Sequence, residues 1–501
     1  MSKSARFLVV CSAALFFTLG CMRSATSRNE APSPDAPSSV APLSELAPDV
    51  VLSPEDQTES ALANTRRADS EDRTPDGQLP QLTPQEHMRR AAIYHANRAF
   101  NEAREHWRAV IDRYPNDPNV PNAIFLTGRS LFQERRYEEA LPYFEQLGDS
   151  YTSTPSGRDG FYYVAATKLR LGRADEAAAR YAEYIDRFPA GERVEQAYLN
   201  IIDTLREAGR PDDAIPWIER TRQRFPGTVT DTNAVFARLR LDVSRGDWPS
   251  AVRTSEQLGL MTFARGVATS KTEVAYLRAY ALERSGRKEQ AAEAYRSIPD
   301  SLDSYYGGLA TARLRAMGGA ARKEADDREA RVRAEAVRGA TNYPAPFRDA
   351  LLRAVRGRSL DPRLMLSIMR QESGFRPTAK SQAGARGLMQ LTVDAAARYG
   401  PQAGLSGVSE EDLYRAETSI LVGGAYLDTL VKMFPGLPEA VAASYNGGED
   451  NVARWVRRAG QKDPGVFTSD VGFTESKDYV LKVISNYRAY KLLYDEKLIR
   501  K

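Results

Sequence analysis

A repeat of 37 residues constrains what the middle of this chain can fold into. It is marked by alanines at a constant interval of 37 residues and by a sixth alanine 40 residues further on: Ala103, Ala140, Ala177, Ala214, Ala251 and Ala291. One helical turn after these alanines come mostly large side chains: Trp107, Phe144, Tyr181, Ile218, Ser255 and Tyr295. Because residues i and i+4 share a face of a helix, each unit presents a small and a large side chain together.

Glycines and prolines recur at fixed positions of the same repeat. Gly172, Gly209, Gly246 and Gly286 predict turns between paired helices, and Pro115, Pro189 and Pro226 predict the ends of the second helices. Helix-turn-helix units of this kind resemble tetratricopeptide repeats. Residues 86–300 are therefore predicted to form a helical repeat solenoid with a concave surface, on which we expect a protein partner that the sequence does not identify.

The N-terminus resembles an export signal. Lys3 and Arg6 precede an apolar run from Phe7 to Leu19, and Gly20 precedes Cys21 as in the lipobox of bacterial lipoproteins. Residues 1–21 are predicted to be a signal peptide, with Cys21 lipidated and the protein held at the outer membrane from the periplasmic side. A plain signal peptide and an uncleaved anchor are the alternatives. Residues 22–85, rich in Pro, Ser and Ala, are predicted to be a disordered tether.

Composition excludes some classes of function. The 501 residues, 42% hydrophobic and 27% charged, are typical of a soluble globular protein with several domains. A net charge of +4 does not favour nucleic acid as a partner. No metal site and no cofactor are predicted, and the region from residue 342 onward contains no His for a Ser-His triad.

A compact C-terminal region is predicted at 342–501, after a helical connector at 301–341. Within it, Asp361 is a suitable N-cap and Pro362 a suitable first residue for a helix that ends near Ser373. Glu372 follows Met365 at i+7 on the apolar stripe of this helix. Burial raises the pKa of a carboxyl, as a general acid requires, although a solvated charge at the helix end is the simpler alternative.

Two later segments carry polar groups suited to a ligand. In Lys380 to Thr392, glycines permit tight turns beside Ser381 and Gln390. Tyr445 and Asn446 precede a pair of glycines. Each segment alone is weak evidence for a ligand-binding site. The order and spacing of the segments along the chain are more specific.

Together these segments resemble the lytic murein transglycosylases, whose catalytic domain is similar to goose-type lysozyme. The resemblance covers about residues 343–494 and is carried by these motifs: Glu372-Ser373, Ser381, Gly384-Ala385, Gly387 to Gln390, Ser444 to Gly448, Glu475-Ser476 and Tyr479-Val480. The fold class it implies is mainly α, with the helical repeats followed by a lysozyme-like catalytic domain. Ser444, Gly447 and Ser476 depart from the family pattern without removing a titratable group.

The resemblance implies that Glu372 is the catalytic acid and base. It implies a sugar-binding cleft formed by Ser381, Met389, Gln390, Tyr445 and Asn446, with Glu475 as a further contact. The expected substrate is the peptidoglycan glycan strand, cut between N-acetylmuramic acid and N-acetylglucosamine with formation of a 1,6-anhydro product.

Two alternatives remain open from the sequence. A hydrolytic muramidase would use a second carboxylate, for which Asp394, Glu417 and Asp450 are available without any context that favours one. A periplasmic scaffold would bind glycan without cutting it and would not need an acid on an apolar stripe.

Overall fold

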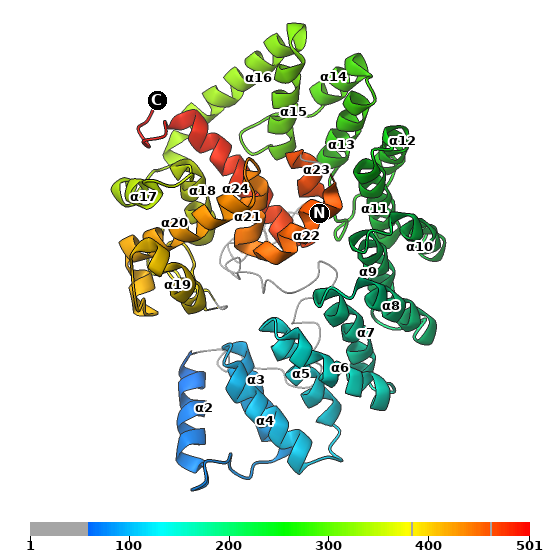
Figure 1. The fold of residues 1–501 in the computed structure, drawn as a ribbon, viewed down its shortest axis with the longest axis vertical. Coiled ribbons are helices and arrows are strands. Elements are labelled where there is room, and N and C mark those ends of the chain that lie inside the picture. The colour runs from blue at the N-terminus through cyan, green and yellow to red at the C-terminus, as the bar shows by residue number, and fades with distance from the viewer. Residues whose placement is uncertain (1–58, 382–383, 461–462) are drawn as a thin grey trace, which may run out of the picture.

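The computed structural model describes residues 59–381, 384–460 and 463–501, and the regular secondary structure there is helical (Figure 1). The predicted signal peptide, Cys21 and the first part of the predicted tether lie outside the described residues. Within the described ranges there is no β-strand, only isolated bridges such as Lys380 with Arg386. No helix in the described part is long and apolar enough to cross a membrane.

The repeat prediction is confirmed by pairs of antiparallel helices that stack in chain order. Their bounds are α3 (Pro84–Ala96), α4 (Phe100–Arg113), α5 (Val120–Gln133), α6 (Tyr137–Ser150), α7 (Pro155–Arg170), α8 (Ala174–Arg187), α9 (Val194–Glu207), α10 (Pro211–Arg224), α11 (Val229–Arg245), α12 (Trp248–Gly259), α13 (Lys271–Arg284) and α14 (Lys288–Arg296). The six marker alanines lie on the second helix of each pair and are fully buried, and the six residues one turn later are buried with them. Most of these residues belong to two hydrophobic clusters, one under the earlier repeats and one under the later repeats, which meet at α11.

The predicted tether ends earlier than residue 85. Residues Glu59–Asp72 form a helix, α2, which packs against α3. Asp69 on α2 is buried, where it accepts hydrogen bonds from Arg90 and from the hydroxyl of Tyr94 (2.5 Å) and lies 3.0 Å from Nε2 of His106. A few specific polar contacts therefore order a segment whose low hydrophobicity had predicted disorder.

The helical connector follows the repeats and leads into the C-terminal domain. It comprises α15 (Tyr305–Met317) and α16 (Gly319–Arg338). The C-terminal domain contains α17 (Arg348–Val355), α18 (Pro362–Ser373), α19 (Val393–Tyr399), α20 (Ala416–Met433), α21 (Pro438–Gly447), α22 (Glu449–Ala459), α23 (Pro464–Ser469) and α24 (Thr474–Leu493), with short 3-10 turns at Ala340–Asn342, Pro401–Ala403 and Glu411–Tyr414. Helices α18 and α21 both pack on α24, around which this domain is built.

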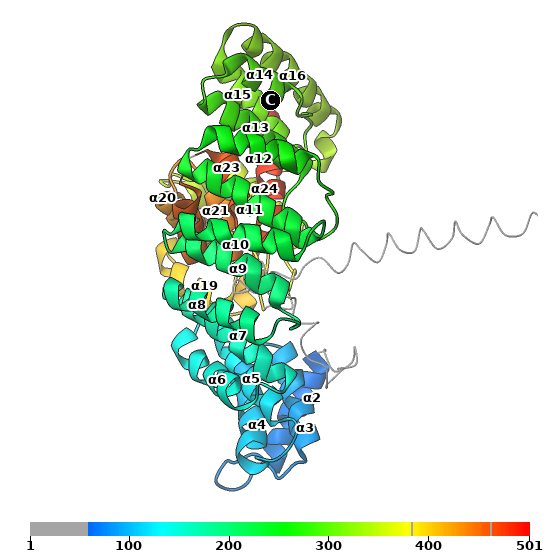
Figure 2. The same ribbon diagram turned by 90° about the vertical axis from the view of Figure 1, so that its right-hand side faces the viewer.

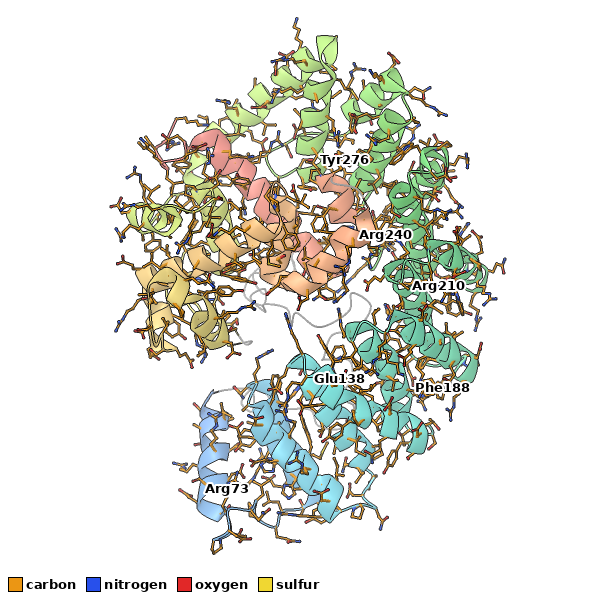
Figure 3. The ribbon with its side chains drawn as sticks, in the orientation of Figure 1. Arg73, Glu138, Phe188, Arg210, Arg240 and Tyr276 are labelled. Atoms are coloured by element: carbon orange, nitrogen blue, oxygen red, sulfur yellow. The ribbon has the colours of Figure 1, made fainter. Side chains whose placement is uncertain are left out.

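The C-terminal domain sits inside the arc of the repeats. Figure 1 shows α22 and α23 facing α9 to α13, and Figure 2 shows the same stack edge-on. Asp470, fully buried after α23, pairs with Arg206 of α9 (3.0 Å), Arg240 of α11 (3.3 Å) and Arg458 of α22 (3.1 Å). Arg240 and Tyr276 both lie on the side of the repeats that faces this domain, as Figure 3 shows.

Further polar contacts extend this interface. The hydroxyl of Tyr276 donates to Asp463 (2.9 Å), and Lys477 pairs with Glu273 (2.7 Å). This stretch of the inner face, where we expected a protein partner, is thus occupied by the C-terminal domain of the same chain.

Candidate active site

Glu372 lies in the last turn of α18, as its position in the sequence predicts. Asp361 caps this helix by accepting from the backbone N–H of Arg363 (2.8 Å), and Pro362 is the first helical residue. Met365 is fully buried on the stripe that leads to Glu372, whereas Glu372 itself is only partly buried. Glu372 therefore lies at the edge of the apolar core.

Tyr479 of α24 is the direct partner of this carboxyl group. Its hydroxyl donates a hydrogen bond of 2.6 Å to Oε1 of Glu372. Burial raises the pKa of Glu372 to about 7, and the negative charge of nearby Glu475 adds to this rise while the hydrogen bond from Tyr479 opposes it. A carboxyl group with this pKa can be protonated or ionised near neutral pH, so it can both donate and accept a proton.

The loop after α18 is held in shape by its own backbone and side chains. Ser381 is buried and its hydroxyl accepts from the N–H of Ala385 (3.0 Å). The amide nitrogen of Gln390 donates to the carbonyls of Ala379 (3.0 Å) and Gly387 (2.9 Å). These polar groups, which we expected to contact a ligand, thus stabilise the loop that borders Glu372.

Gly387 shows why this loop needs glycine. Its φ is +73°, and a Cβ atom there would lie 1.9 Å from the carbonyl oxygen of Leu413. No other residue fits this close approach.

The expectation for Met389 is wrong as far as its side chain is concerned. That side chain is fully buried and packs against Gly423 of α20, where a Cβ atom would come within 2.8 Å of it, so it cannot contact a substrate. Its carbonyl oxygen instead accepts a hydrogen bond of 2.6 Å from the hydroxyl of Tyr445. Met389 therefore anchors the Tyr445 ring.

Tyr445 belongs to a group of aromatic rings beside Glu372. Its ring lies 5.1 Å from Tyr426, which stacks on Tyr399 at 4.5 Å. Burial and the charge of Glu372 raise the pKa of Tyr445 well above its usual value, so this phenol stays protonated. Tyr445 is partly buried, and a face of this kind suits stacking against a sugar ring.

Asn446 is partly buried and hydrogen-bonded within the protein, whereas Glu475 is exposed. The side-chain carbonyl of Asn446 accepts from the hydroxyl of Ser476 (2.6 Å), which joins the end of α21 to the first turn of α24. Glu475 is exposed in that same turn and acts on Glu372 through its charge. The structure thus brings Glu372, Tyr445 and Glu475 close together. The loop that carries Ser381 and Gln390 is joined to Tyr445 through the carbonyl of Met389, and Asn446 follows Tyr445 on the same helix.

The carboxylates considered for a hydrolytic mechanism lie elsewhere on the surface. Asp394 and Asp450 are exposed, and the exposed Glu417 pairs with Arg353 (2.8 Å). No group of three or more His, Cys, Asp or Glu side chains within residues 59–381, 384–460 and 463–501 could hold a metal ion.

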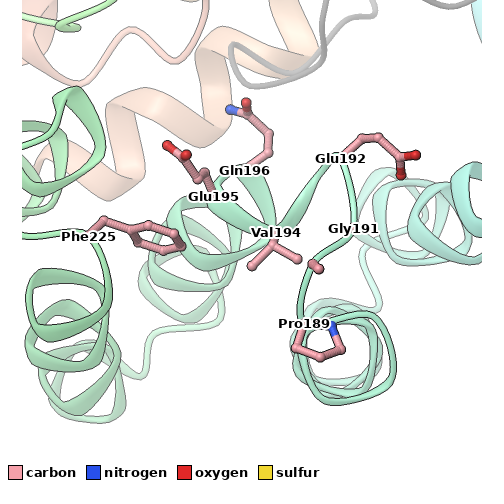
Figure 4. Close-up of a pocket in the computed structure, with 8 residues that line it drawn as sticks. Pro189, Gly191, Glu192, Val194, Glu195, Gln196 and Phe225 are labelled. Atoms are coloured by element: carbon pink, nitrogen blue, oxygen red, sulfur yellow. The ribbon is translucent and has the colours of Figure 1, made fainter.

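A separate pocket of about 420 Å³ lies on the repeats, between the ends of α8 and α10. Figure 4 shows its lining, which includes Glu192, Glu195 and Gln196 around Val194 and Phe225. It contains none of the residues around Glu372 and is a feature of the repeat stacking.

Sequence reasoning assigned no role to Tyr479. The residue was visible as part of the Tyr479-Val480 motif, but its contact with Glu372 joins positions 107 residues apart. Its membership of the same set of family motifs as Glu372, together with its hydroxyl group, was the available signal.

Comparison with known proteins identifies the two parts of the chain. Residues 350–467 match the transglycosylase SLT domain, and residues 90–152 and 165–228 match the tetratricopeptide repeat. The soluble lytic murein transglycosylase of Escherichia coli (strain K12) is 31% identical over 150 residues, which cover 30% of this chain and 23% of that protein. The membrane-bound lytic murein transglycosylase C of Salmonella arizonae is 33% identical over 160 residues, which cover 28% of this chain and 44% of that protein.

A solved structure of an inactive mutant of the lytic transglycosylase Slt from Pseudomonas aeruginosa aligns with 86% of this chain and 75% of that chain, at 21% identity and a TM-score of 0.47. The chain spans less than half the length of the two sequence relatives in the aligned regions. The chain therefore combines tetratricopeptide repeats with a C-terminal domain of the transglycosylase SLT family, and Glu372 lies in that domain.

Proposed function

We propose that this protein is a lytic transglycosylase that cuts the β-1,4 bond between N-acetylmuramic acid and N-acetylglucosamine in peptidoglycan. The observation that carries the proposal is the state of Glu372: a partly buried carboxyl group whose pKa is raised to about 7 and whose orientation is fixed by Tyr479. Such a group is suited to protonate a glycosidic oxygen and then to accept a proton.

The proposed reaction uses this one carboxyl group twice. Protonated Glu372 donates to the glycosidic oxygen while positive charge develops at C1 of the muramic ring, which the oxygen of the 2-acetamido group stabilises. Ionised Glu372 then takes the proton of the C6 hydroxyl of the same sugar, and that oxygen bonds to C1. The N-acetylglucosamine end leaves with a free 4-hydroxyl, the muramic end closes as a 1,6-anhydro ring, and no water is consumed.

Tyr479 has a defined part in this cycle. Its hydroxyl donates to Oε1 of Glu372, so it favours the ionised form that follows proton donation and keeps the carboxyl group in one orientation. Tyr445, anchored on the Met389 carbonyl, supplies an aromatic surface for a sugar ring. Gln390, Asn446 and Glu475 are the further candidates for contact with the glycan.

The cellular setting completes the proposal. Peptidoglycan is reached from the periplasm, and a lipid on Cys21 would hold the protein at the outer membrane. The stretch before Glu59 would then be the tether that lets the enzyme reach the glycan.

The test is digestion of purified sacculi by the mature protein and by Glu372→Gln, with the released muropeptides weighed by mass spectrometry. The proposal expects products lighter by one water than hydrolytic muropeptides, absent with the variant. Hydrated products would indicate a muramidase, and binding without release would indicate a glycan-binding scaffold. Either result would overturn the proposed reaction.

A further inference from the structure

The last repeat interval is longer than the others. Ala251 and Ala291 are 40 residues apart, whereas the other marker alanines follow one another every 37 residues. The structure shows where the chain is longer: residues 260–270 connect α12 to α13, while residues 225–228 connect the preceding pair, α10 and α11. The shorter connection is enough to stack the helices, so the longer loop is available for other contacts.

This loop is fixed to the repeats and presents a carbonyl group to the C-terminal domain. The side-chain amide of Asn233 on α11 donates to the carbonyl of Gly266 (3.1 Å) and accepts from the N–H of Ala268 (2.8 Å). The carbonyl of Ala268 in turn accepts a hydrogen bond of 2.9 Å from Nζ of Lys477, near the start of α24. The loop thus joins the repeats to the helix that carries Tyr479.

Lys477 is a buried ammonium group. Only 7% of Lys477 and 2% of Glu273 are exposed, and Nζ lies 2.7 Å from Oε1 of Glu273 in the first turn of α13. Nζ also lies 4.9 Å from the centre of the Phe236 ring. Burial lowers the pKa of Lys477, and the negative charge of Glu273 opposes this change. A buried ion pair adds little stability over an apolar pair of similar size but requires a defined geometry, so it suits a role in positioning.

Lys477 and its neighbours face different sides of α24. Glu475 and Tyr479 are four residues apart, so they share one face of the helix, and Lys477 between them points to another. On the first face, Tyr479 donates to Glu372 (2.6 Å), and Glu475 acts on Glu372 through its charge. A shift of this helix end that moved Lys477 would therefore also move both groups that act on Glu372.

We propose that Lys477 is a positioning residue through which the repeats hold the start of α24 beside the candidate catalytic carboxyl group. Its ammonium group is fixed between Glu273 and the carbonyl of Ala268. This contact keeps the Tyr479 hydroxyl within hydrogen-bond distance of Glu372. The repeats thereby take part in the reaction without touching the glycan. This inference rests on the proposed function.

The test replaces the ion pair by a neutral pair, Lys477→Met with Glu273→Gln, so that both buried charges are removed together. Glu273→Gln alone, which keeps the side-chain size, is the second variant. The matched control is Arg488→Met with Asp300→Asn. It neutralises another ion pair of α24 (2.6 Å), about two and a half turns beyond Tyr479. Thermal unfolding checks that the variants fold, and kcat and KM are measured on soluble glycan strands over a range of pH.

The neutral pair at Lys477 should lower kcat about tenfold and leave KM within about twofold, because it loosens the contact with Glu372 and leaves the glycan-binding groups in place. The limb of the pH–rate profile on which activity falls should move in the same direction as in Tyr479→Phe. In the Tyr479→Phe background the same change should lower kcat little further, since two changes that act through one contact are not additive. The control should keep the wild-type kcat and profile.

Amide hydrogen exchange of residues 474–480 reports the positioning without any turnover. It should be faster in the neutral-pair variant and unchanged in the control. Unchanged exchange or unchanged kcat in a folded variant, an equal loss of kcat in the control, or an undiminished loss in the Tyr479→Phe background would overturn the inference. If the wild type releases no product, the proposed function itself fails, and the exchange of residues 474–480 still decides whether Lys477 holds the helix.

Discussion

Tyr479 and Glu372 lie 107 residues apart in the sequence and share a hydrogen bond of 2.6 Å in the structure. The bond joins α24, the central helix of this domain, to the end of α18 at the candidate catalytic carboxyl group. Removal of the Tyr479 hydroxyl is therefore the most local way to alter Glu372 without replacing it.

We expect Tyr479→Phe to lower kcat by about 10 to 100-fold, because the carboxyl group loses its fixed orientation. The hydrogen bond stabilises ionised Glu372, so its loss should raise the pKa of Glu372 further above 7. The limb of the pH–rate profile on which activity falls as pH rises should then move to higher pH. An unchanged profile with lower kcat would mean that Tyr479 acts only through packing.

Glu372 should destabilise the folded protein at neutral and alkaline pH. Its pKa is about 7 in the fold against 4.5 in an exposed chain, so between these values the unfolded chain loses its proton first and stability falls as pH rises. The full effect above pH 7 is about 3 to 4 kcal/mol, since each pKa unit is worth about 1.4 kcal/mol.

Glu372→Gln should consequently raise the unfolding temperature at pH 8 and leave it unchanged at pH 4. Differential scanning calorimetry of both proteins at the two pH values measures this difference. An equal shift at both pH values would show that the variant stabilises through something other than lost ionisation.

The alanine and aromatic periodicity allowed the repeats to be predicted correctly, because one helical turn links each small residue to its large neighbour within five residues of sequence. The start of α18 could be predicted because its signals, Asp361 and Pro362, are adjacent in the sequence. Position on that helix was also enough to place Glu372 beside the apolar core.

The features that could not be predicted from the sequence depend on contacts between distant segments. Asp470 pairs with Arg206, 264 residues away, and no local sequence pattern predicts that pair. Met389 was expected in the sugar-binding cleft because it belongs to the motif Gly387 to Gln390, but its side chain is buried in the core of the domain. The helix α2 was missed because Asp69 is held by three polar partners and not by an apolar stripe.

Asp470→Asn should weaken the joint between repeats and C-terminal domain. Although burial raises the pKa of Asp470, Arg206 and its neighbouring arginines bring it below its ordinary value, so this carboxylate is ionised and central to the pairing. Loss of its charge leaves buried arginines uncompensated, at a cost of about 3 to 5 kcal/mol. Thermal unfolding should begin at a clearly lower temperature.

The matched control is Asp212→Asn, which removes an exposed pair with Arg245 (2.6 Å) within the repeats. Its effect should stay below about 1 kcal/mol, as for surface ion pairs in general. Similar losses in both variants would contradict the idea that Asp470 holds the two domains together.

The stability of the first repeat should depend on pH through His87, which lies on α3. This ring is fully buried, with its Nδ1 2.9 Å from Nδ1 of His106, and burial lowers its pKa to about 4 from 6.5. The unfolded chain therefore takes up a proton first as pH falls from 6.5 to 4, and the free energy of unfolding drops over that window by about 3 to 4 kcal/mol.

His87→Leu should flatten the dependence of unfolding temperature on pH between 7 and 4.5. Burial also lowers the pKa of His95, a second histidine of the same repeat, to about 4, so His95→Leu should remove a further part of the slope. The double variant should show the smallest slope. A slope equal to that of the wild type in all three variants would contradict the assignment.

The most direct test of the account is digestion of peptidoglycan in water enriched in ¹⁸O, followed by mass spectrometry of the products. If Glu372 delivers the C6 hydroxyl of the muramic sugar to C1, the muramic ends carry no ¹⁸O, are lighter than hydrolytic ends by one water, and are absent with Glu372→Gln. Muramic ends that contain ¹⁸O would show that water attacks C1, and the account of a single carboxyl group acting twice would be wrong.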